Sequence, residues 1–421
     1  MTRSPPSGRR PPICYSPAAD GRTARMTGSA LHRILCGIGL ILPLVALPPS
    51  LTAEEAKLAD PSASEAPAQS RFRSAEDGWL DVSGFLDEAY GFIPIAIPIT
   101  EPAVGLGGAG ALMFVDKQPG GAKAGFGRPN ITVVGALGTE NGTRGAFAGD
   151  VRHWLDDRLK TVVGVIDASV NLDFYGIGRD PDLERHPKSY NLETRAAVAQ
   201  ARYRIGDTPF WIGLGYVRAN TTVTFDLLPA HPLIPDIQSG SQVGGLLPHL
   251  SFDSRDNVFT PTAGTYLEAS AGLFSKELGG DSNFQRINLV GIHFRPVLHD
   301  LIFGINAGST LSYGEVPFYL RPFVALRGAP AMRYQGDGTA QVEAELRWQL
   351  WQRFSLLGFA GTGRAWNDSR WRNSEQEVTT YGVGFRYEIA REYGLHIGID
   401  VATGPDGPAW YVQVGNAWMR P

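Results

Sequence analysis

The segment from Val342 to Leu350 alternates strictly between apolar and polar residues. Residues spaced by two share one face of a β-strand. One face therefore carries Val342, Ala344, Leu346, Trp348 and Leu350, and the other carries Glu343, Glu345, Arg347 and Gln349. The first face suits lipid and the second suits a polar interior. Such a pattern is typical of a strand in a transmembrane β-barrel.

Period-two alternation recurs in other segments, among them residues 162–174, 381–389 and 395–401. A soluble β-sandwich, which buries its apolar faces against each other, is the alternative. Long strands together with a secretory leader favour the membrane barrel. The sequence thus predicts an all-β fold, a transmembrane antiparallel β-barrel of about sixteen strands. The last of these to be placed is expected between Ile93 and Leu106, where closely spaced prolines exclude a central strand.

Turn lengths differ between the two ends of the expected strands. Short turn-forming sequences occur at residues 156–157, 206–209 and 260–264, and long connections at residues 176–190, 227–242 and 314–338. In outer-membrane barrels the short turns face the periplasm and the long loops face outward. The spacing therefore predicts which strands run in which direction.

The N-terminal region has the features of a secretory signal. Residues 34–49 are apolar, follow Arg33, and precede the small-residue site at Ala53. The signal peptide is expected to cover residues 1–53, with Met26 as an alternative start. A transmembrane anchor is the other interpretation, but the run is shorter than the ~18–20 residues that span a bilayer. Export predicts the bacterial outer membrane as the location.

Removal of residues 1–53 changes the chemistry of the chain. It removes both cysteines and takes the net charge from −4 to −9, because six basic residues and one acidic residue are lost. Disulfides and nucleic-acid binding are therefore not expected. Residues 54–103 are predicted to be a partly disordered periplasmic lead-in, and residues 104–421 the barrel.

Four motifs in the second half, in this order, resemble the outer-membrane barrel family of BamA and TamA, the bacterial surface antigen family. They are the turn at residues 254–265, the Leu326-Arg327-Gly328 loop motif, the glycine-rich segment 358–368, and the terminal segment 413–418. The resemblance implies a long loop folded into the barrel. It also implies that assembly machinery recognises the last strand.

The resemblance and the strand pattern together give the candidate site residues. They are the loop motif Arg327 and Gly328, the lumen partners Glu343 and Glu345, the barrel-closing strand with Gly415 and Trp418, and the periplasmic turn with Asp256, Asn257, Pro261 and Gly264. Two departures from the family pattern stand out. Residues 54–104 are too short and proline-rich for a POTRA domain, and Gly361 stands where the family has an aspartate. A weak, solvated Arg327 pair is expected for that reason.

No motif for a metal, cofactor or nucleophile stands out, so no cofactor and no enzymatic activity are predicted. Asp253, Asp256 and Asn257 could suggest calcium, but capping of a tight turn is the favoured interpretation. The expected function is transport or insertion of protein or lipid at the outer membrane, with outer-membrane lipid, the barrel assembly machinery and a periplasmic protein as partners. A passive diffusion porin is the alternative. An outer-membrane hydrolase using Ser282 is third.

Overall fold

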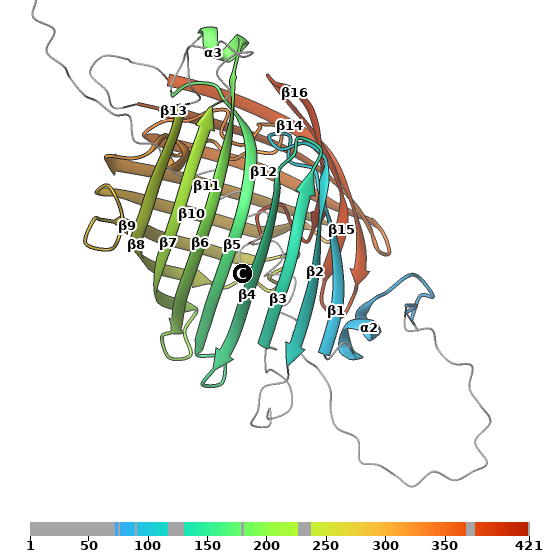
Figure 1. Cartoon of the computed structure of the whole chain (residues 1–421). Coiled ribbons are helices and arrows are strands. Elements are labelled where there is room, and N and C mark those ends of the chain that lie inside the picture. Colours follow the sequence, from blue (N-terminus) through green and yellow to red (C-terminus); the bar gives the residue numbers. More distant parts are fainter. Residues whose placement is uncertain are drawn as a thin grey trace, which may run out of the picture.

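The computed structural model describes residues 72–74, 76–88, 91–116, 130–177, 181–225, 237–367 and 375–419. One 16-stranded antiparallel sheet, in which each strand pairs with the next along the chain, curls into a barrel (Figure 1). Its strands are β1 (Gly91–Ile99), β2 (Gly107–Asp116), β3 (Asn130–Thr139), β4 (Arg144–Trp154), β5 (Leu159–Phe174), β6 (Lys188–Arg204), β7 (Phe210–Phe225), β8 (Ile237–Asp253), β9 (Gly264–Phe274), β10 (Phe284–Leu298), β11 (Leu301–Gly314), β12 (Gly338–Trp351), β13 (Phe354–Trp366), β14 (Glu375–Ala390), β15 (Leu395–Gly404) and β16 (Gly407–Val414). The predicted fold class is confirmed.

Among the described residues, three short helices lie outside the sheet: α2 (Ser83–Glu88), α3 (Pro181–Arg185) and the 3-10 helix η2 (Phe318–Leu320). Within the described ranges, no helix has the length and apolar character needed to cross a membrane. The expected leader and the lead-in as far as residue 71 lie outside the described residues.

The faces of β12 differ as the sequence predicts. Leu346 and Trp348 are 47% and 51% exposed on the outer surface, where lipid would lie. Glu343 and Glu345 are buried inside the barrel. Because a charge on the lipid face is costly, the charged residues fix which face of this strand turns inward.

The long-loop half of β5 corrects the expectation that apolar faces turn outward. Ile166, Val170 and Leu172 are buried inside the barrel, whereas Asp167 and Asp173 are exposed outside. Apolar side chains turn inward here because they meet an apolar partner, the loop between β11 and β12. The interior is therefore not uniformly polar.

The first and last strands are the two edges of the sheet. β1 pairs with β2 and β16 pairs with β15, and no ladder pair joins β1 to β16, both of which lie within the described residues. The backbone N–H of Val412 in β16 donates to Oγ1 of Thr100, the residue after β1, at 3.2 Å. The barrel is thus nearly closed, and we call the line between β1 and β16 the seam.

β1 is the strand expected between residues 93 and 106, and it begins at Gly91. The sheet therefore starts before residue 104, which corrects the expected boundary. Pro94 and Pro98 lie in β1 and pair with Leu112 and Gly108 of β2. A proline fits an edge strand when its nitrogen faces away from the paired neighbour. The donors that the two prolines lack are therefore missing from the edge that faces β16.

The predicted short turns lie at one rim of the barrel and the predicted long loops at the other, although the long-loop end also carries the short β3–β4 and β15–β16 turns. The turns β4–β5, β6–β7, β10–β11, β12–β13 and β14–β15 are short and share one rim, which we call the short-turn rim. β1 begins and β16 ends there. The opposite, long-loop rim carries α3 and the β11–β12 connection, as the upper part of Figure 1 shows for α3. Most of the expected long loop at residues 227–242 lies outside the described residues.

Candidate functional site

The loop between β11 and β12, residues 315–337, is folded into the barrel. Phe318, Tyr319 and Met332 pack against the inner faces of β2 to β7. Val324 and Leu326 form a second apolar cluster with residues of β13 and β14. Full burial of one large apolar side chain is worth about 1.5–3 kcal/mol. The loop is therefore part of the barrel core, in the position that the resemblance implies.

Arg327 is the polar anchor of this loop. Its Nε donates to Glu343 Oε1 at 2.7 Å, its Nη2 to Glu345 Oε2 at 2.9 Å, and its Nη1 to Asp400 Oδ2 at 2.8 Å. Its guanidinium carbon also lies 3.5 Å from the centre of the Phe359 ring. Arg327 is only 7% exposed, so little water screens these contacts.

The expectation of a weak, solvated Arg327 pair is wrong. Gly361 makes room for the loop, because a Cβ at that position would lie 3.0 Å from Leu326 Cδ2. The acid that is missing from position 361 is supplied by Asp400 of β15, which also accepts a hydrogen bond from Arg386 Nη1 at 2.5 Å. Loss of one partner from such a buried group costs about 3–5 kcal/mol.

The charges around the anchor balance. Three buried arginines and three buried carboxylates lie together: Arg327, Arg347, Arg386, Glu343, Glu345 and Asp400. Such balance is what makes burial of charge tolerable. Arg386 and Asp400 stand at polar positions of alternating segments, but the sequence assigned them no role. Only the pairing of β14 with β15 brings them together.

Gly328 holds the loop against the last strands of the barrel. Its φ of +90° is a conformation that glycine adopts readily, and a Cβ there would lie 3.2 Å from Ala402 Cβ and 3.2 Å from Thr403 O. Its backbone N–H donates to the Tyr411 hydroxyl at 2.9 Å. A glycine after Arg327 thus lets the loop approach both β15 and β16.

The same loop contacts both sides of the seam at the long-loop rim. Arg333 Nε donates to Asp406 Oδ1 at 2.9 Å and the Tyr334 hydroxyl to Asp406 Oδ2 at 2.7 Å, in the β15–β16 turn. The backbone N–H of Ala331 donates to Glu101 Oε1 at 3.0 Å, just after β1. The loop therefore bridges the two edge strands at this rim.

Gly415 and Trp418 lie beyond the last strand, which corrects their expected place within a barrel-closing strand. β16 ends at Val414, and Gly415 turns the chain with a φ of +75°. Trp418 is buried, and its indole Nε1 donates to Glu343 Oε1 at 3.0 Å. The tail thus enters the barrel and contacts the carboxylate that also holds Arg327.

The turn between β8 and β9 also folds inward. Asp256 Oδ1 accepts the backbone N–H groups of Thr262 and Ala263 at 3.0 and 3.2 Å, so the carboxylate caps the turn. Asn257 Nδ2 donates to Tyr393 O at 2.8 Å. These contacts favour the turn interpretation over calcium, and no group of three or more potential metal ligands occurs in the described part of the chain.

Pro261 and Gly264 fix the remainder of this turn. The carbonyl of Pro261 accepts from Arg347 Nη2 at 2.7 Å. Gly264 has a φ of +107°, and a Cβ there would meet Ser254 O at 2.3 Å. The turn therefore connects the short-turn rim to the charged cluster inside the barrel.

Ser282, the residue of the hydrolase alternative, lies in the β9–β10 loop and is buried. The carboxylate of its neighbour Asp281 accepts the backbone N–H of Gln242 at 2.7 Å. That contact joins the loop to β8 and gives Asp281 a structural role. The arrangement of the site is best suited to holding the β11–β12 loop in place through ion pairs and apolar packing.

Comparison with known proteins gives structural matches only. No protein-family model matches the chain, and no curated protein matches it. The crystal structure of BamA from Haemophilus ducreyi lacking POTRA domains 1–3 is similar, with a TM-score of 0.54, 11% identity, and coverage of 82% of this chain and 80% of that one. CdiB from Escherichia coli has a TM-score of 0.52 and 12% identity over 78% of this chain and 60% of that one. The chain has a BamA-like barrel fold.

Two of the four sequence motifs meet inside the barrel. The Arg327-Gly328 motif lies inside the lumen, and the glycine-rich segment forms β13, against which Val324 and Leu326 of the loop pack. At 11–12% identity the comparison concerns the fold.

Proposed function

We propose that this BamA-like barrel resides in the bacterial outer membrane and helps protein substrates enter the membrane through its seam. One observation carries the proposal: the lumen is occupied by an anchored loop, whereas β1 and β16 are not paired. Substrate passage is therefore easier to accommodate at the side of the barrel than through its centre. The expected signal peptide, residues 1–53, is consistent with export.

The seam favours protein over lipid as the substrate. The unpaired edge of β16 offers backbone donors and acceptors that another β-strand can satisfy, whereas Pro94 and Pro98 interrupt the edge of β1. In a bilayer each unsatisfied backbone group costs several kcal/mol, so an incoming strand would gain from pairing there. A lipid has no row of backbone donors and acceptors that would pair with a strand edge. Transport of lipid remains an outcome that the same experiment can detect.

The porin alternative is less well supported. An open diffusion pore needs a water-filled path, but Tyr319 and Met332 of the loop are 0% and 1% exposed within the barrel. The charged cluster around Arg327 is neutralised internally and offers no free charge to guide an ion. Similarity to BamA and CdiB barrels also fits a role in assembly or transport together with a periplasmic partner protein.

A reversible lock across the seam tests the proposal. Cysteines at Thr100 and Val412 would lie on opposite sides of the seam, where these two residues are already in contact. The matched control is a cysteine pair at Leu112 and Val134, which are exposed register partners of the intact β2–β3 ladder. An unfolded eight-stranded outer-membrane barrel, added to vesicles containing each variant, provides the probe.

Insertion of the probe is followed by its heat-dependent gel mobility. We expect wild-type protein to accelerate insertion, oxidation of the seam pair to abolish the acceleration, and reduction to restore it. Oxidation of the control pair should have no effect. Equal acceleration by the oxidised seam pair would refute the proposal. Transfer of a fluorescent phospholipid without any effect on the probe would instead identify lipid as the substrate.

A further inference from the structure

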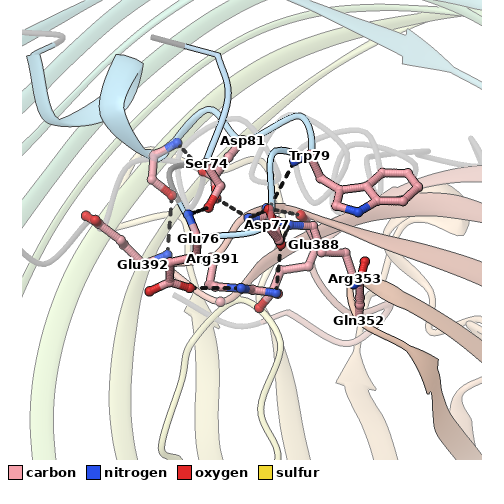
Figure 2. Close-up of polar contacts among 12 residues, drawn as sticks. Ser74, Glu76, Asp77, Trp79, Asp81, Gln352, Arg353, Glu388, Arg391 and Glu392 are labelled. Atoms are coloured by element: carbon pink, nitrogen blue, oxygen red, sulfur yellow. Dashed lines mark hydrogen bonds and ion pairs between the residues drawn. The ribbon is translucent and has the colours of Figure 1, made fainter. Parts of the chain in front are cut away.

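The described residues 72–74 and 76–88 run along the short-turn rim before the chain enters β1. Figure 2 shows this segment lying over the turns that follow β12 and β14. Its ion pairs are made with two arginines of these turns, Arg353 and Arg391, which would ordinarily be solvated. Along the chain, the segment comes successively closer to the seam.

The first contact is made with the β12–β13 turn. Arg353 in that turn is 0% exposed, and its Nε donates to Asp77 Oδ2 at 2.6 Å while its Nη2 lies 2.8 Å from Asp81 Oδ2. The Trp79 ring meets the rings of Trp351 and Phe354 edge-on, with centroid distances of 5.4 and 5.3 Å. Arg353 thus forms ion pairs with two carboxylates of the segment, next to an aromatic contact.

The second contact is made with the β14–β15 turn. The backbone N–H of Val82 donates to Ile389 O at 2.8 Å, and the Tyr387 hydroxyl donates to Leu80 O at 2.7 Å. Arg391 Nη1 donates to Glu76 Oε2 at 3.0 Å (Figure 2). The segment is therefore fixed to the strands on the β16 side of the seam.

The segment then crosses to the other side. Helix α2, Ser83–Glu88, follows these contacts directly, and β1 begins at Gly91. Along the rim the chain passes from the β12–β13 turn to the β14–β15 turn and then to β1. The segment therefore spans the seam at this rim, where β1 and β16 form no ladder.

We propose that residues 72–74 and 76–88 form a clasp that holds the β1 edge near β14 and β15 at the short-turn rim, and that release of the clasp lets the seam widen. The contacts are ion pairs, hydrogen bonds, one aromatic cluster and the packing of Val82 and Phe85 against two apolar clusters. None of them is a ladder between barrel strands, so they can break without unpairing any barrel strand. The loop contacts of Glu101 and Asp406 hold the opposite end of the seam. The role of the clasp rests on the proposed function, because it controls the same seam. Whether the segment docks and holds the seam can be measured without a substrate.

Spin-label distances across the seam test the clasp in the full chain. One label pair is placed at Ala96 in β1 and Val414 in β16, and a reference pair at Leu112 and Val134 in the intact β2–β3 ladder. The clasp is weakened by Arg353→Gln, and more strongly by Arg353→Gln combined with Trp79→Ala. The matched control is Arg158→Gln, because Arg158 also belongs to a short turn and pairs with Asp207 at 3.0 Å, on strands away from the seam.

We expect the clasp variants to add a longer-distance component to the seam pair and to leave the reference pair unchanged. Arg158→Gln should change neither. Mobility of a third label at Gly84 in α2 reports whether the segment has left the rim. A mobile Gly84 label with an unchanged seam distance would overturn the proposal. So would a Gly84 label that stays immobile in the double variant, since the segment would then be held by contacts other than those assigned here. Because no substrate is present, failure of the clasp is distinguishable from failure of the proposed function.

Discussion

Arg327 in the β11–β12 loop donates a hydrogen bond to Asp400 in β15 across 2.8 Å. Asp400 is 0% exposed and is shared with Arg386 of β14. The contact ties a loop that leaves β11 to strands near the end of the chain. Loop position, strand register and charge balance are therefore coupled at one carboxylate.

Replacement of Arg327 by alanine is expected to release the loop and leave the barrel folded. Three buried carboxylates would lose their common partner, at a cost of about 3–5 kcal/mol. If cleavage follows the open population, trypsin should cut the Arg333–Tyr334 bond ~10²–10⁴-fold faster. The exposed Arg195, paired with Asp167, provides the control, and Arg195→Ala should have little effect. Loss of heat-dependent gel mobility in Arg327→Ala would contradict the expectation.

A double-mutant cycle between Arg327 and Glu345 tests whether the two act as one unit. Glu345→Gln should increase loop cleavage as Arg327→Ala does, and the double variant should be little worse than either single one. Residues in direct contact are expected to show such non-additivity. Additive effects would place the two residues in separate interactions.

Gly328→Ala is expected to loosen the loop more than a glycine replacement that introduces backbone strain alone. Both Gly328 and Gly407 have positive φ, +90° and +101°. A Cβ at Gly328 also meets Ala402 and Thr403, whereas a Cβ at Gly407 meets nothing within 4 Å. Strain of about 1–3 kcal/mol applies to both. Equal cleavage at Arg333 in the two variants would show that close packing of Gly328 is unimportant.

Trp418 can be dissected by two replacements. Trp418→Phe keeps a ring near Phe294 but removes the donor to Glu343, and a hydrogen bond to a charged group is worth about 1.5–3 kcal/mol. Trp418→Ala also removes the packing and should cost about 3–5 kcal/mol. The midpoint temperature of the gel-mobility change should fall in that order. Identical midpoints for wild type and both variants would mean that the tail does not hold the barrel together.

Conductance separates a filled barrel from a pore. Wild-type protein in a planar bilayer should give small and unsteady currents because the loop occupies the lumen. Deletion of residues 316–334 should enlarge the current, and Arg327→Ala should give an intermediate result. A large, steady current through wild-type protein would favour the porin.

The clasp should respond to strongly acidic pH only. The hydrogen bond from Arg353 lowers the pKa of Asp77 from 3.8 to about 2. Asp81 is partly desolvated, which raises its pKa, but hydrogen bonds from Ser83 and Arg353 outweigh this and the pKa is lowered overall. A carboxylate with a lowered pKa stabilises the docked state above its ordinary pKa, and the contribution is lost as pH falls through the lowered value.

We therefore expect the label at Gly84 to stay immobile at pH 5 and to become mobile as the pH falls from about 4 towards 2. Asp77→Asn should weaken docking at neutral pH and reduce the remaining pH response. Release of the label between pH 7 and pH 5 would show that other groups control the clasp.

The sequence predicted the features that depend on local alternation. β12, the parity of turns, and the loop motif at Arg327 and Gly328 could be identified because each has a short, regular pattern. The inward apolar face of β5 could not, since alternation does not say which face turns inward when a loop fills the lumen. The outer face of β5 is polar in its long-loop half because the loop inside the barrel draws the apolar face inward.

Contacts between residues far apart in the sequence could not be predicted either. Asp400 replaces the acid missing at Gly361, but this becomes visible only when β15 lies near β12 inside a closed ring. Arg353 occupies a short turn, where an arginine is usually solvated, so nothing in its neighbourhood predicts burial by Asp77 and Asp81. The tail beyond Val414 likewise resembles a strand in sequence until Gly415 turns it inward.

Pro94 and Pro98 have a consequence for crowding. Outer membranes hold many barrels side by side, and an open strand edge on one copy could extend its sheet onto the edge of another. Two missing donors, spaced along the free edge of β1, interrupt the row that such a contact would need. The β1 edge of one copy is therefore a poor partner for the β16 edge of another, so that neighbouring barrels stay separate although both edges are unpaired.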